Sequence, residues 1–305
     1  MAISRHQLVK ELEPGLNALF GLEYKRYDNQ HAEIYTSESS DRAFEEEVML
    51  SGFGNASVKS EGSGVAFDNA QESYSARYTH ETVALAFAIT EEAIEDNLYD
   101  RISSRYTKAL ARSMSNTKQV KAAAPLNNGL PSVDGFDSGD GVSLFNTSHT
   151  TVSGTSVKNT LSTQADLNET SLEQAMIDIS GMTDERGLRI AAKAVKMIVP
   201  SANQFQAERL MKSQGRVGTA DNDINSLASM GMIPQGYRVN NFLTDTDSFY
   251  IITDVPNGMK MFTRAPLTTA MEGDFDTGNV RYKARERYSF GFSDPRGIFG
   301  SPGAA

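Results

Sequence analysis

The sequence predicts an α+β fold that is elongated rather than spherical, and three observations lead to this. Apolar residues return at helical spacing over residues 91–121, which predicts one helix of about 45 Å, more than a compact domain requires. Apolar and polar residues alternate over residues 280–292, as in a long strand with one buried face. Helix and strand patterns then alternate over residues 168–267, so a second α/β unit is expected.

Composition narrows the class of protein. A chain of 305 residues is expected to form about two domains, and its 22% charged and 39% hydrophobic residues are ordinary for a soluble globular protein. The net charge of −10 argues against a general nucleic-acid binder, since such proteins bind phosphates with Lys and Arg. The absence of Cys excludes disulfides, thiol catalysis and Cys-based zinc sites, and fits a reducing cytoplasm. No apolar run is long enough for a signal peptide or membrane span, so no membrane partner is expected.

The predicted long helix has one apolar stripe and charges sorted by end. Acids fill its first half and bases its second half, which suits the helix macrodipole. Thr90 is a suitable N-cap, and Pro125 ends the pattern. We interpret the helix as a spine joining distant parts of the subunit, and an ordinary amphipathic helix in a large domain is the alternative. The stripe consists of Ile94, Leu98, Ile102, Tyr106, Leu110 and Met114.

Two segments before the helix lack a hydrophobic core of their own. Residues 1–41 form a predicted N-terminal arm, with a short helix interrupted near Pro14 and a polar stretch over 27–41 that only neighbouring copies could order. Residues 42–80 form a predicted extended hairpin, whose middle, NASVKSEGSG, is small and polar. Such a hairpin lies across another subunit, or it is a disordered surface loop. Alternation at Val83, Leu85, Phe87 and Ile89 then predicts a strand that leads into the long helix.

The second half of the chain has several further predicted elements. A short strand is expected at residues 142–145, and a helix capped by Thr170 and Glu173 carries a stripe of Leu172, Ala175, Met176 and Ile179. A strand at 194–199 precedes a helix that begins near Gln204 and carries Phe205, Leu210 and Met211. Strands at 249–255 and 259–262 flank the turn at residues 256–258.

The strand at residues 280–292 has the most unusual charge pattern. Its apolar face is interrupted only by Glu286, and its other face carries Arg281, Lys283, Arg285 and Arg287. A solvated edge strand protected by its charges is one interpretation. A ladder that pairs with acids of a neighbouring subunit is the second, with Glu45, Glu46 and Glu47 as candidate partners. A surface that faces DNA is the third.

No catalytic or cofactor-binding constellation is found. The four histidines are widely separated, without metalloprotease spacing, and no nucleophile elbow, phosphate loop or dinucleotide fingerprint follows a strand. His149 is expected to be a hydrogen-bonded loop residue. Asp134, Asp137 and Asp140 in a glycine-rich loop are expected to be solvated rather than to bind a cation. We therefore expect no enzyme activity, no cofactor and no metal.

Several segments, in this order, resemble the major capsid protein of tailed bacteriophages with the Hong Kong 97-type fold, and especially the branch of Mu-like major head subunits. The resemblance covers nearly the whole chain. The segments are VALAFAITEEAIEDNLYD, LFNTSHT, KMIVPSANQFQAERLM, FYIITDVPNGMKMFTRAPL and VRYKARERYSFGFSDPRGIFGS.

The resemblance implies a domain organisation and a role. Residues 1–41 would be the arm, 42–80 the extended hairpin, 81–167 and 268–305 the peripheral domain with spine helix 91–121, and 168–267 the axial domain. Copies would form hexamers and pentamers of an icosahedral shell around double-stranded DNA, assembled in the host bacterial cytoplasm into a virion capsid. A portal protein and a decoration protein would be further partners.

Two departures from the family pattern and three alternatives remain. The chain begins almost at the arm, so a separate scaffolding protein is expected, or a propeptide already removed. Lys59 lies where a crosslinking hairpin lysine would be needed, but Lys–Asn crosslinks are not expected. The alternatives are an encapsulin-like compartment, a soluble hydrolase and a monomeric binding module.

Overall fold

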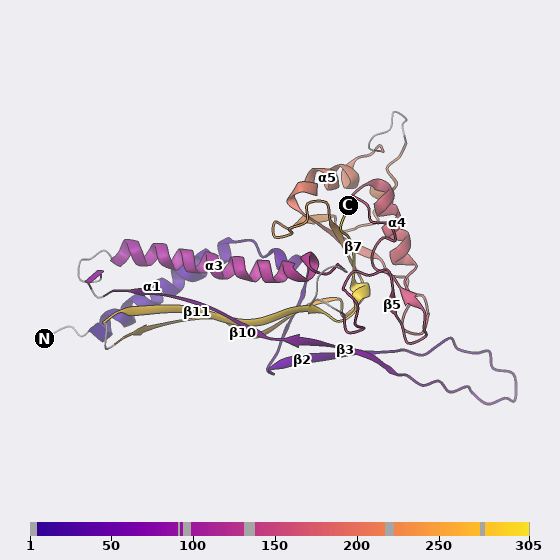
Figure 1. The fold of residues 1–305 in the computed structure, drawn as a ribbon, viewed down its shortest axis with the longest axis horizontal. Coiled ribbons are helices and arrows are strands. Elements are labelled where there is room, and N and C mark those ends of the chain that lie inside the picture. The colour runs from indigo at the N-terminus through magenta and orange to yellow at the C-terminus, as the bar shows by residue number, and fades with distance from the viewer. Residues whose placement is uncertain are drawn as a thin grey trace.

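The computed structural model describes residues 5–90, 92–93, 99–130, 138–216, 223–274 and 278–304. An elongated part, in which two helices lie along a sheet, carries a compact block at one end (Figure 1). A hairpin extends from that same end and passes beyond the compact block. The molecule is therefore an angular plate with one projection rather than a sphere.

The secondary structure is as follows. The helices are α1 (Arg5–Arg26), α3 (Tyr99–Asn127), α4 (Glu169–Ser180), α5 (Gln204–Lys212) and α6 (Ser226–Met230), with short 3-10 helices η1 (Gln30–Glu33), η2 (Ser201–Asn203) and η3 (Pro295–Gly297). The strands are β1 (Thr36–Ser39), β2 (Phe44–Leu50), β3 (Glu72–Thr79), β4 (Glu81–Ile89), β5 (His149–Thr150), β6 (Ser156–Val157), β7 (Ala194–Val199), β8 (Tyr237–Val239), β9 (Phe249–Thr253), β10 (Met259–Gly273), β11 (Val280–Phe292) and β12 (Ile298–Ser301).

The elongated sheet has the strand order β1-β10-β11-β4. β11 covers the predicted range and pairs antiparallel with β10 on one side and with β4 on the other. The interpretation of residues 280–292 as an edge strand is therefore wrong, because alternation alone does not distinguish an inner strand from an edge strand. β4, the strand predicted from the alternation at 83–89, forms one edge.

β10 is longer than predicted. Its expected end at Phe262 is wrong, because the strand continues to Gly273 through two register shifts between Thr263 and Thr268. Pro266 lies in this irregular stretch, and a proline cannot donate to the ladder. Because the pattern is interrupted at Pro266, the sequence does not show that one strand continues on both sides of it.

Two helices cover one face of the elongated sheet. Leu16 and Phe20 of α1 are buried in one cluster with three residues of α3 and with Tyr282 and Ala284 of β11. As predicted, the apolar residues of β11 point inward, while Arg281, Lys283 and Arg285 are exposed on the opposite face. The α3 residues of the cluster are Leu110, Ala111 and Met114.

The predicted arm has a core within its own chain. α1 continues through Pro14 as one helix, and the polar stretch after it is fixed by long-range contacts. The Tyr35 hydroxyl donates to Ala122 O at 2.6 Å, the His31 backbone N–H donates to Gln119 Oε1 at 3.0 Å, and β1 pairs in parallel with β10. The expectation that only neighbouring copies could order residues 27–41 is wrong, because single polar contacts across nearly 90 residues leave no periodic signal.

The long helix is confirmed over its described part, with two corrections. α3 ends at Asn127, six residues beyond the expected end, and Pro125 is accommodated in its last turn. Leu110 and Met114 are buried, but Tyr106 is 53% exposed, with its ring centroid 5.9 Å from that of Phe87. Ile94 and Leu98 lie outside the described residues.

The compact block is built around a second sheet, with the order β12-β9-β7-β8. β7 has the predicted bounds, and the predicted stripe of α4 is buried against it in the largest core. The cap of α4 is not the predicted Thr170–Glu173 pair: Asn168 Oδ1 accepts from Ser171 N at 2.8 Å, and Ser171 Oγ accepts from Asn168 N at 3.0 Å. In α5, Leu210 is buried as expected, whereas Phe205 is 69% exposed.

Two further observations concern the connections. The prediction of a strand at residues 142–145 is wrong. Leu144 and Phe145 are fully buried in a turn, so these residues are apolar because they are buried and not because they pair with a strand. Residues 259–267, grouped above with the axial domain, lie in the elongated sheet, and β12 pairs with β9 of the compact block. The positions of the two parts in a shell stay predictions.

The buried residues of α1 generate the first testable prediction. Phe20→Ala should lower the free energy of unfolding by about 3–5 kcal/mol, because Phe20 is 2% exposed between α3 and β11. Leu22→Ala is the matched control on the same helix; Leu22 is 72% exposed, so a change within about 0.5 kcal/mol is expected. Urea unfolding measures both, and equal effects would contradict the packing of α1 described here.

Candidate assembly surfaces

The hairpin of residues 44–79 exposes apolar side chains that its own chain does not cover. β2 and β3 pair antiparallel, and the connection between them extends away from the rest of the molecule (Figure 1). Residues 55–70 are all exposed, and among them Val58 is 98% and Phe67 97% exposed. Side chains of this size are normally buried at least in part, so this stretch is a candidate contact surface.

The base of the hairpin is fixed to the elongated sheet and to the turn after β11. The Glu47 carboxylate binds the Lys260 ammonium and accepts from the Ser293 hydroxyl. The Tyr78 hydroxyl shares a 2.5 Å hydrogen bond with Ser293 Oγ, and the Tyr74 hydroxyl donates to Ser293 O at 3.2 Å. The direction in which the hairpin leaves the molecule is therefore set by side chains of its own subunit.

A second attachment joins the hairpin to the compact block. Arg186, in the turn after α4, forms an ion pair with Asp68 at 2.8 Å, and the other Asp68 oxygen accepts from Gly54 N at 2.7 Å. These bonds hold the pKa of the Asp68 carboxyl below its usual value. Beyond this point, residues 55–67 have no ion pair within the described part of the chain.

The acids predicted to meet a neighbouring subunit are engaged within the chain. Glu45 accepts from Ser40 Oγ at 2.7 Å, Glu46 lies 3.7 Å from Arg77 Nε, and Glu47 binds Lys260 as described. Lys59 is exposed in the hairpin connection. The structure does not bring any of these residues to the basic residues of β11, and their role between subunits stays a prediction.

The four bases of β11 divide into two groups. Arg281, Lys283 and Arg285 are exposed on the sheet face away from the helices, which we call the strand face. Arg281 forms an ion pair with Asp274 and lies opposite Glu272 in the register of β10. Arg287 is half-buried, and its Nε has no hydrogen-bond partner among the described residues.

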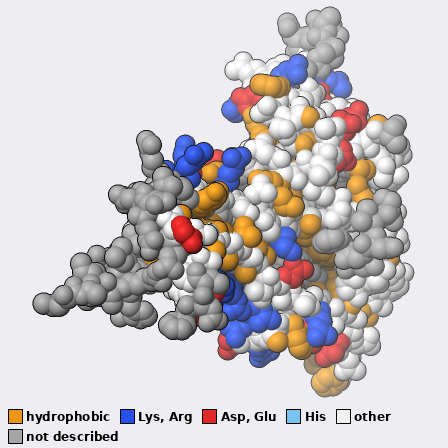
Figure 2. Space-filling model, turned by 60° about the vertical axis from the view of Figure 1, so that its left-hand side comes forward, with side chains coloured by type: hydrophobic (Ala, Val, Ile, Leu, Met, Phe, Trp, Pro, Cys, Tyr) orange, Lys and Arg blue, Asp and Glu red, His pale blue; other side chains and the backbone are white. Residues whose placement is uncertain are grey.

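The strand face is nearly flat around its bases. Its neighbours in register on β4 are alanines: Ala88 lies beside Arg281, Ala86 beside Lys283 and Ala84 beside Arg285. A shallow hollow of about 350 Å³ lies between Ala86, Ala270 and the long side chains. Lys and Arg side chains gather in the lower part of the space-filling view, with Asp and Glu side chains at the margins (Figure 2).

Beneath the strand face, the interruption of the apolar pattern has a structural reason. Glu286, only 2% exposed, forms an ion pair with Lys118 of α3 at 3.2 Å. Burial raises the pKa of the Glu286 carboxyl, and Lys118 opposes this shift. Burial also lowers the pKa of the neighbouring His31 to about 4, so His31 is neutral at pH 7. The pair joins α3 to the inner face of β11.

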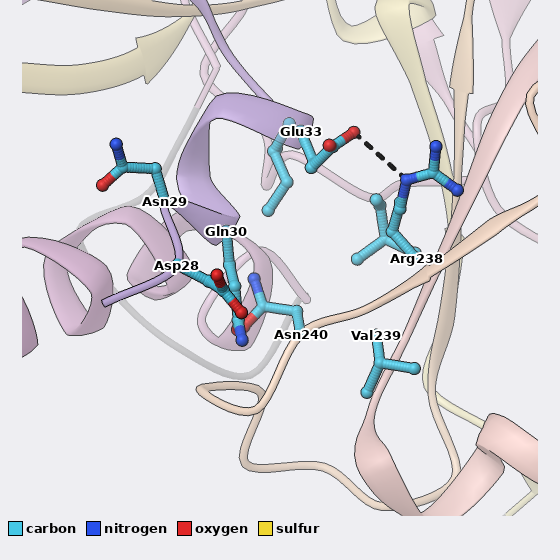
Figure 3. A pocket seen from close by; sticks show the side chains of 9 residues that line it. Asp28, Asn29, Gln30, Glu33, Arg238, Val239 and Asn240 are labelled. Atoms are coloured by element: carbon cyan, nitrogen blue, oxygen red, sulfur yellow. Dashed lines mark ion pairs between the residues drawn. The ribbon is translucent and has the colours of Figure 1, made fainter. Parts of the chain in front are cut away.

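A cleft of about 300 Å³ marks the place where the arm crosses the compact block (Figure 3). Glu33 of η1 points toward Arg238 of β8 at 3.5 Å and binds Lys196 of β7 at 2.5 Å. The hydrogen bond from Lys196 holds the pKa of Glu33 below its usual value. The polar groups of the cleft thus serve to attach the arm.

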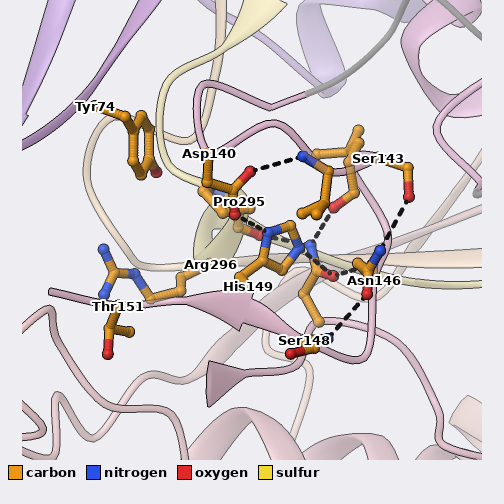
Figure 4. A network of polar contacts seen from close by, with 12 residues as sticks. Tyr74, Asp140, Ser143, Asn146, Ser148, His149, Thr151, Pro295 and Arg296 are labelled. Carbon is orange, nitrogen blue, oxygen red and sulfur yellow. Dashed lines mark hydrogen bonds and ion pairs between the residues drawn. The ribbon is translucent and has the colours of Figure 1, made fainter. Parts of the chain in front are cut away.

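His149 is a hydrogen-bonded structural residue, as predicted. It is 5% exposed at the start of β5; its Nδ1 lies 2.7 Å from Asp140 Oδ2 and its Nε2 3.2 Å from Asn159 Oδ1 (Figure 4). The Asn159 amide in turn donates to Leu144 O and Pro295 O. Both ring nitrogens of His149 are therefore engaged by side chains of its own chain.

A buried charged cluster lies beside His149. Arg296 donates to Asp294 at 2.8 Å, to Glu185 at 3.0 Å and to Thr183 O at 3.0 Å, and all three charged groups are nearly inaccessible to solvent. Glu185 also accepts from the Ser73 hydroxyl of β3 at 3.2 Å. The cluster connects the compact block, the end of β11 and the base of the hairpin.

The described residues form neither a metal-binding cluster nor a membrane-spanning helix. Within the described ranges, no three His, Asp or Glu side chains are grouped so that they could hold a metal ion. The expectation that Asp140 is solvated is wrong, because its side chain is only 6% exposed and is bound to His149. Asp134 and Asp137 lie outside those ranges. Of the helices that the structure describes, none is long and apolar enough to span a bilayer.

Comparison with protein families identifies the chain. The sequence model of the family described as "Phage capsid protein" matches residues 73–300, which is most of the chain. The chain belongs to the phage capsid protein family. This match favours a phage head over an encapsulin-like compartment. No match was found among curated protein sequences.

Solved capsid structures share the fold of this capsid protein. The capsid of the Myoviridae phage XM1 is 14% identical, with a TM-score of 0.53 over 88% of this chain and 89% of that one. The capsid of cyanophage P-SCSP1u is 12% identical, with a TM-score of 0.54 over 89% and 86%. The virus-like particle from Pyrococcus furiosus is 11% identical, with a TM-score of 0.51 over 94% and 98%. The capsid protein therefore has the Hong Kong 97-type fold.

Sequence reasoning missed most of the contacts that orient the assembly surfaces in this capsid protein. Glu286 could have been found, because an acid inside an apolar alternating face requires a buried partner. Arg186, Lys260 and Arg296 gave no such signal, since their partners lie far away in the chain.

The buried pair of Lys118 and Glu286 generates the second prediction. Lys118→Met should lower the free energy of unfolding by about 3–5 kcal/mol near neutral pH, because it leaves Glu286 buried and without its cation. Lys121→Met is the matched control: Lys121 binds Glu81 at an exposed position, so a loss below about 1 kcal/mol is expected. Chemical denaturation of both variants checks this, and a small loss in Lys118→Met would contradict it.

The same pair predicts a pH dependence. The pKa of Glu286 is raised in the folded chain above its unfolded value of about 4.3, so the folded state binds this proton more tightly. The contribution of Glu286 to stability should be most favourable below that unfolded pKa and decrease as pH rises through the raised folded pKa. Glu286→Gln should remove this part of the pH dependence in denaturation curves. A pH profile identical to that of the wild type would contradict the assignment.

Proposed function

We propose that this capsid protein forms hexamers and pentamers of an icosahedral shell that encloses double-stranded DNA, and that the hairpin of each copy lies over an adjacent copy. The observation that carries the proposal is the exposure of Val58 and Phe67 on a hairpin whose base is fixed. Burying either side chain against a neighbour would contribute about 1.5–3 kcal/mol per contact. Many modest contacts of this kind between symmetry-related copies suit a closed shell.

The remaining partners are proposed from the family resemblance. A separate scaffolding protein, a portal protein and a decoration protein would complete the head, which would assemble in the host bacterial cytoplasm. We propose no enzymatic reaction. The hydrogen bonds at both ring nitrogens of His149 support a structural role for this residue. Residues 168–267 are proposed to surround the axes of the hexamers and pentamers.

Light scattering after size-exclusion chromatography, followed by negative-stain microscopy of the largest species, tests the proposal. Rings, tubes or closed shells are expected, with a co-expressed scaffold where the protein alone gives only capsomers. A chain that stayed monomeric even with its scaffold would overturn the shell role and favour a binding module.

Deleting residues 57–64 generates the fourth prediction. These residues are all exposed and make no described contact with the compact block, so the deletion should leave the fold intact and impair shell formation. Replacing the same eight residues by an equal number of Gly and Ser controls for length, and it should impair shells as well if Val58 provides the contact. Shell yield by microscopy and unfolding by circular dichroism measure the two effects. Normal shells from the deletion would refute the overlapping role.

Charge reversal on the strand face generates the fifth prediction. Lys283→Glu with Arg285→Glu should reduce shell yield while changing the free energy of unfolding by less than about 1 kcal/mol, because both side chains are exposed. Arg209→Glu with Lys212→Glu, exposed on α5, is the matched control, and a smaller loss of shells is expected. Sedimentation of assembled particles gives the yield. An unchanged yield from the strand variant would show that its bases are only solvated.

A further inference from the structure

The elongated part carries basic residues on both of its faces. The strand face lies on one side of the sheet, and α3 lies on the other, where its outer surface is open to solvent. Figure 2 shows one group of Lys and Arg side chains low in the view and another higher, at the level of α3 in Figure 1. In a shell, one of these faces must look inward and the other outward.

The outer surface of α3 is basic over the residues whose side chains the structure describes, from Ser103 onward. Arg105, Lys108 and Arg112 are exposed and follow one another at helical spacing, so they form a stripe about 10 Å long. Residues 101–133 contain six Lys or Arg and no Asp or Glu, in a chain whose net charge is −10. A run of this length without acids is a strong departure from the composition of the whole chain.

The stripe is also not used by the fold. Lys118 and Lys121, further along α3, are paired with Glu286 and Glu81. Arg105, Lys108 and Arg112 have no ion pair with any residue that the structure describes. Tyr106 and Asn116 are exposed beside the stripe and add hydrogen-bonding groups.

The strand face has a different character. Arg281 is bound to Asp274 and lies opposite Glu272, so acids are mixed with the bases at that end. The alanines of β4 leave a smooth floor with a shallow hollow, a shape that accepts another polypeptide. A duplex would meet repulsion from the carboxylates there, whereas another protein segment could pair with both signs of charge.

We infer that the α3 face is the inner face of the shell and that Arg105, Lys108 and Arg112 contact the phosphates of the enclosed double-stranded DNA. This assignment rests on the proposed function, because it needs a shell that encloses DNA. Phosphate contacts by Lys and Arg bind DNA without sequence preference through counterion release. The stripe thus supplies local attraction inside a subunit whose overall charge repels DNA, and the interpretation of the strand face as the DNA-facing surface is replaced.

Binding of a fluorescent 30-base-pair duplex to unassembled full-length protein tests the inference at several salt concentrations. Three variants are compared with the wild type: Arg105→Gln/Lys108→Gln/Arg112→Gln, Lys283→Gln/Arg285→Gln, and Arg209→Gln/Lys212→Gln on α5. The slope of log K against log salt should fall by about 2–3 in the first variant, since each phosphate contact contributes about 0.9. The other two variants should change the slope by less than 1.

The outcomes separate the two proposals. A slope that falls in the strand-face variant and not in the α3 variant would overturn the inference, and so would equal slopes in all proteins. Shell formation, followed by microscopy on the same samples, reports on the proposed function by itself. Wild-type protein that binds DNA through the stripe but never forms shells would contradict the shell and leave the stripe established as a DNA-binding surface.

The absence of Cys permits a direct test of which face is inside. Arg112→Cys and Ser60→Cys, the latter in the exposed hairpin connection, are treated with a maleimide polymer too large to enter closed shells. Arg112→Cys should react in unassembled protein and be protected at least tenfold in intact shells. Equal reactivity of Arg112→Cys before and after assembly would place α3 outside. Ser60→Cys in unassembled protein checks that the reagent modifies an exposed cysteine of this chain.

Discussion

The structure depends on the burial of one face of β11 beneath two helices. Tyr282 and Ala284 are inaccessible because α1 and α3 lie across them, and the strict alternation of a strand then turns the next residues outward. A sheet covered on a single side has no second layer to bury its other face. The strand face must therefore consist of groups that water or another molecule accepts, and in this chain they are bases set among alanines.

Buried charges fix how the parts are joined. Lys118 and Glu286 link α3 to the inner side of β11, and Arg296 with Glu185 and Asp294 links the compact block to the end of the same strand. Removing one member of such a pair leaves a charge without compensation in a dry site, so these pairs penalise other arrangements more than they add stability. Because Glu185 and Ser293 also hold β3, the direction of the hairpin follows from the same contacts.

Residues with a regular apolar pattern were predictable, and residues fixed by distant polar contacts were not. β7 and β11 have the bounds that the sequence predicts, because periodicity and burial coincide there. The order of the strands could not be predicted from the alternation, because alternation shows which face of β11 is buried but not which strands pair with it. The second half of β10 was missed because Pro266 interrupts its pattern. The arm was misjudged for the same reason, since a tyrosine hydroxyl on Ala122 O holds it without any repeating apolar signal. Of the candidate surface, the bases of β11 were found, whereas the engagement of Glu45, Glu46 and Glu47 within the chain required coordinates.

Among its described residues, the folded chain leaves two kinds of side chain without partners, exposed apolar groups and unpaired cations, and the two kinds lie in different places. The hairpin leaves apolar side chains in water, a cost that a protein surface can remove and that depends little on salt. On the outer surface of α3, Arg105, Lys108 and Arg112 have no ion pair among the described residues, and the positive field of such bases attracts a polyanion and is weakened by salt. A single globular partner would have to satisfy both at once, across the thickness of the elongated part. The proposed shell would separate them, because neighbouring copies would meet the hairpin while the enclosed DNA would meet α3. An enclosed particle needs one surface for contacts with neighbouring copies and another for contacts with its content. In the described part of this subunit the exposed apolar side chains and the unpaired bases lie on two such separate surfaces.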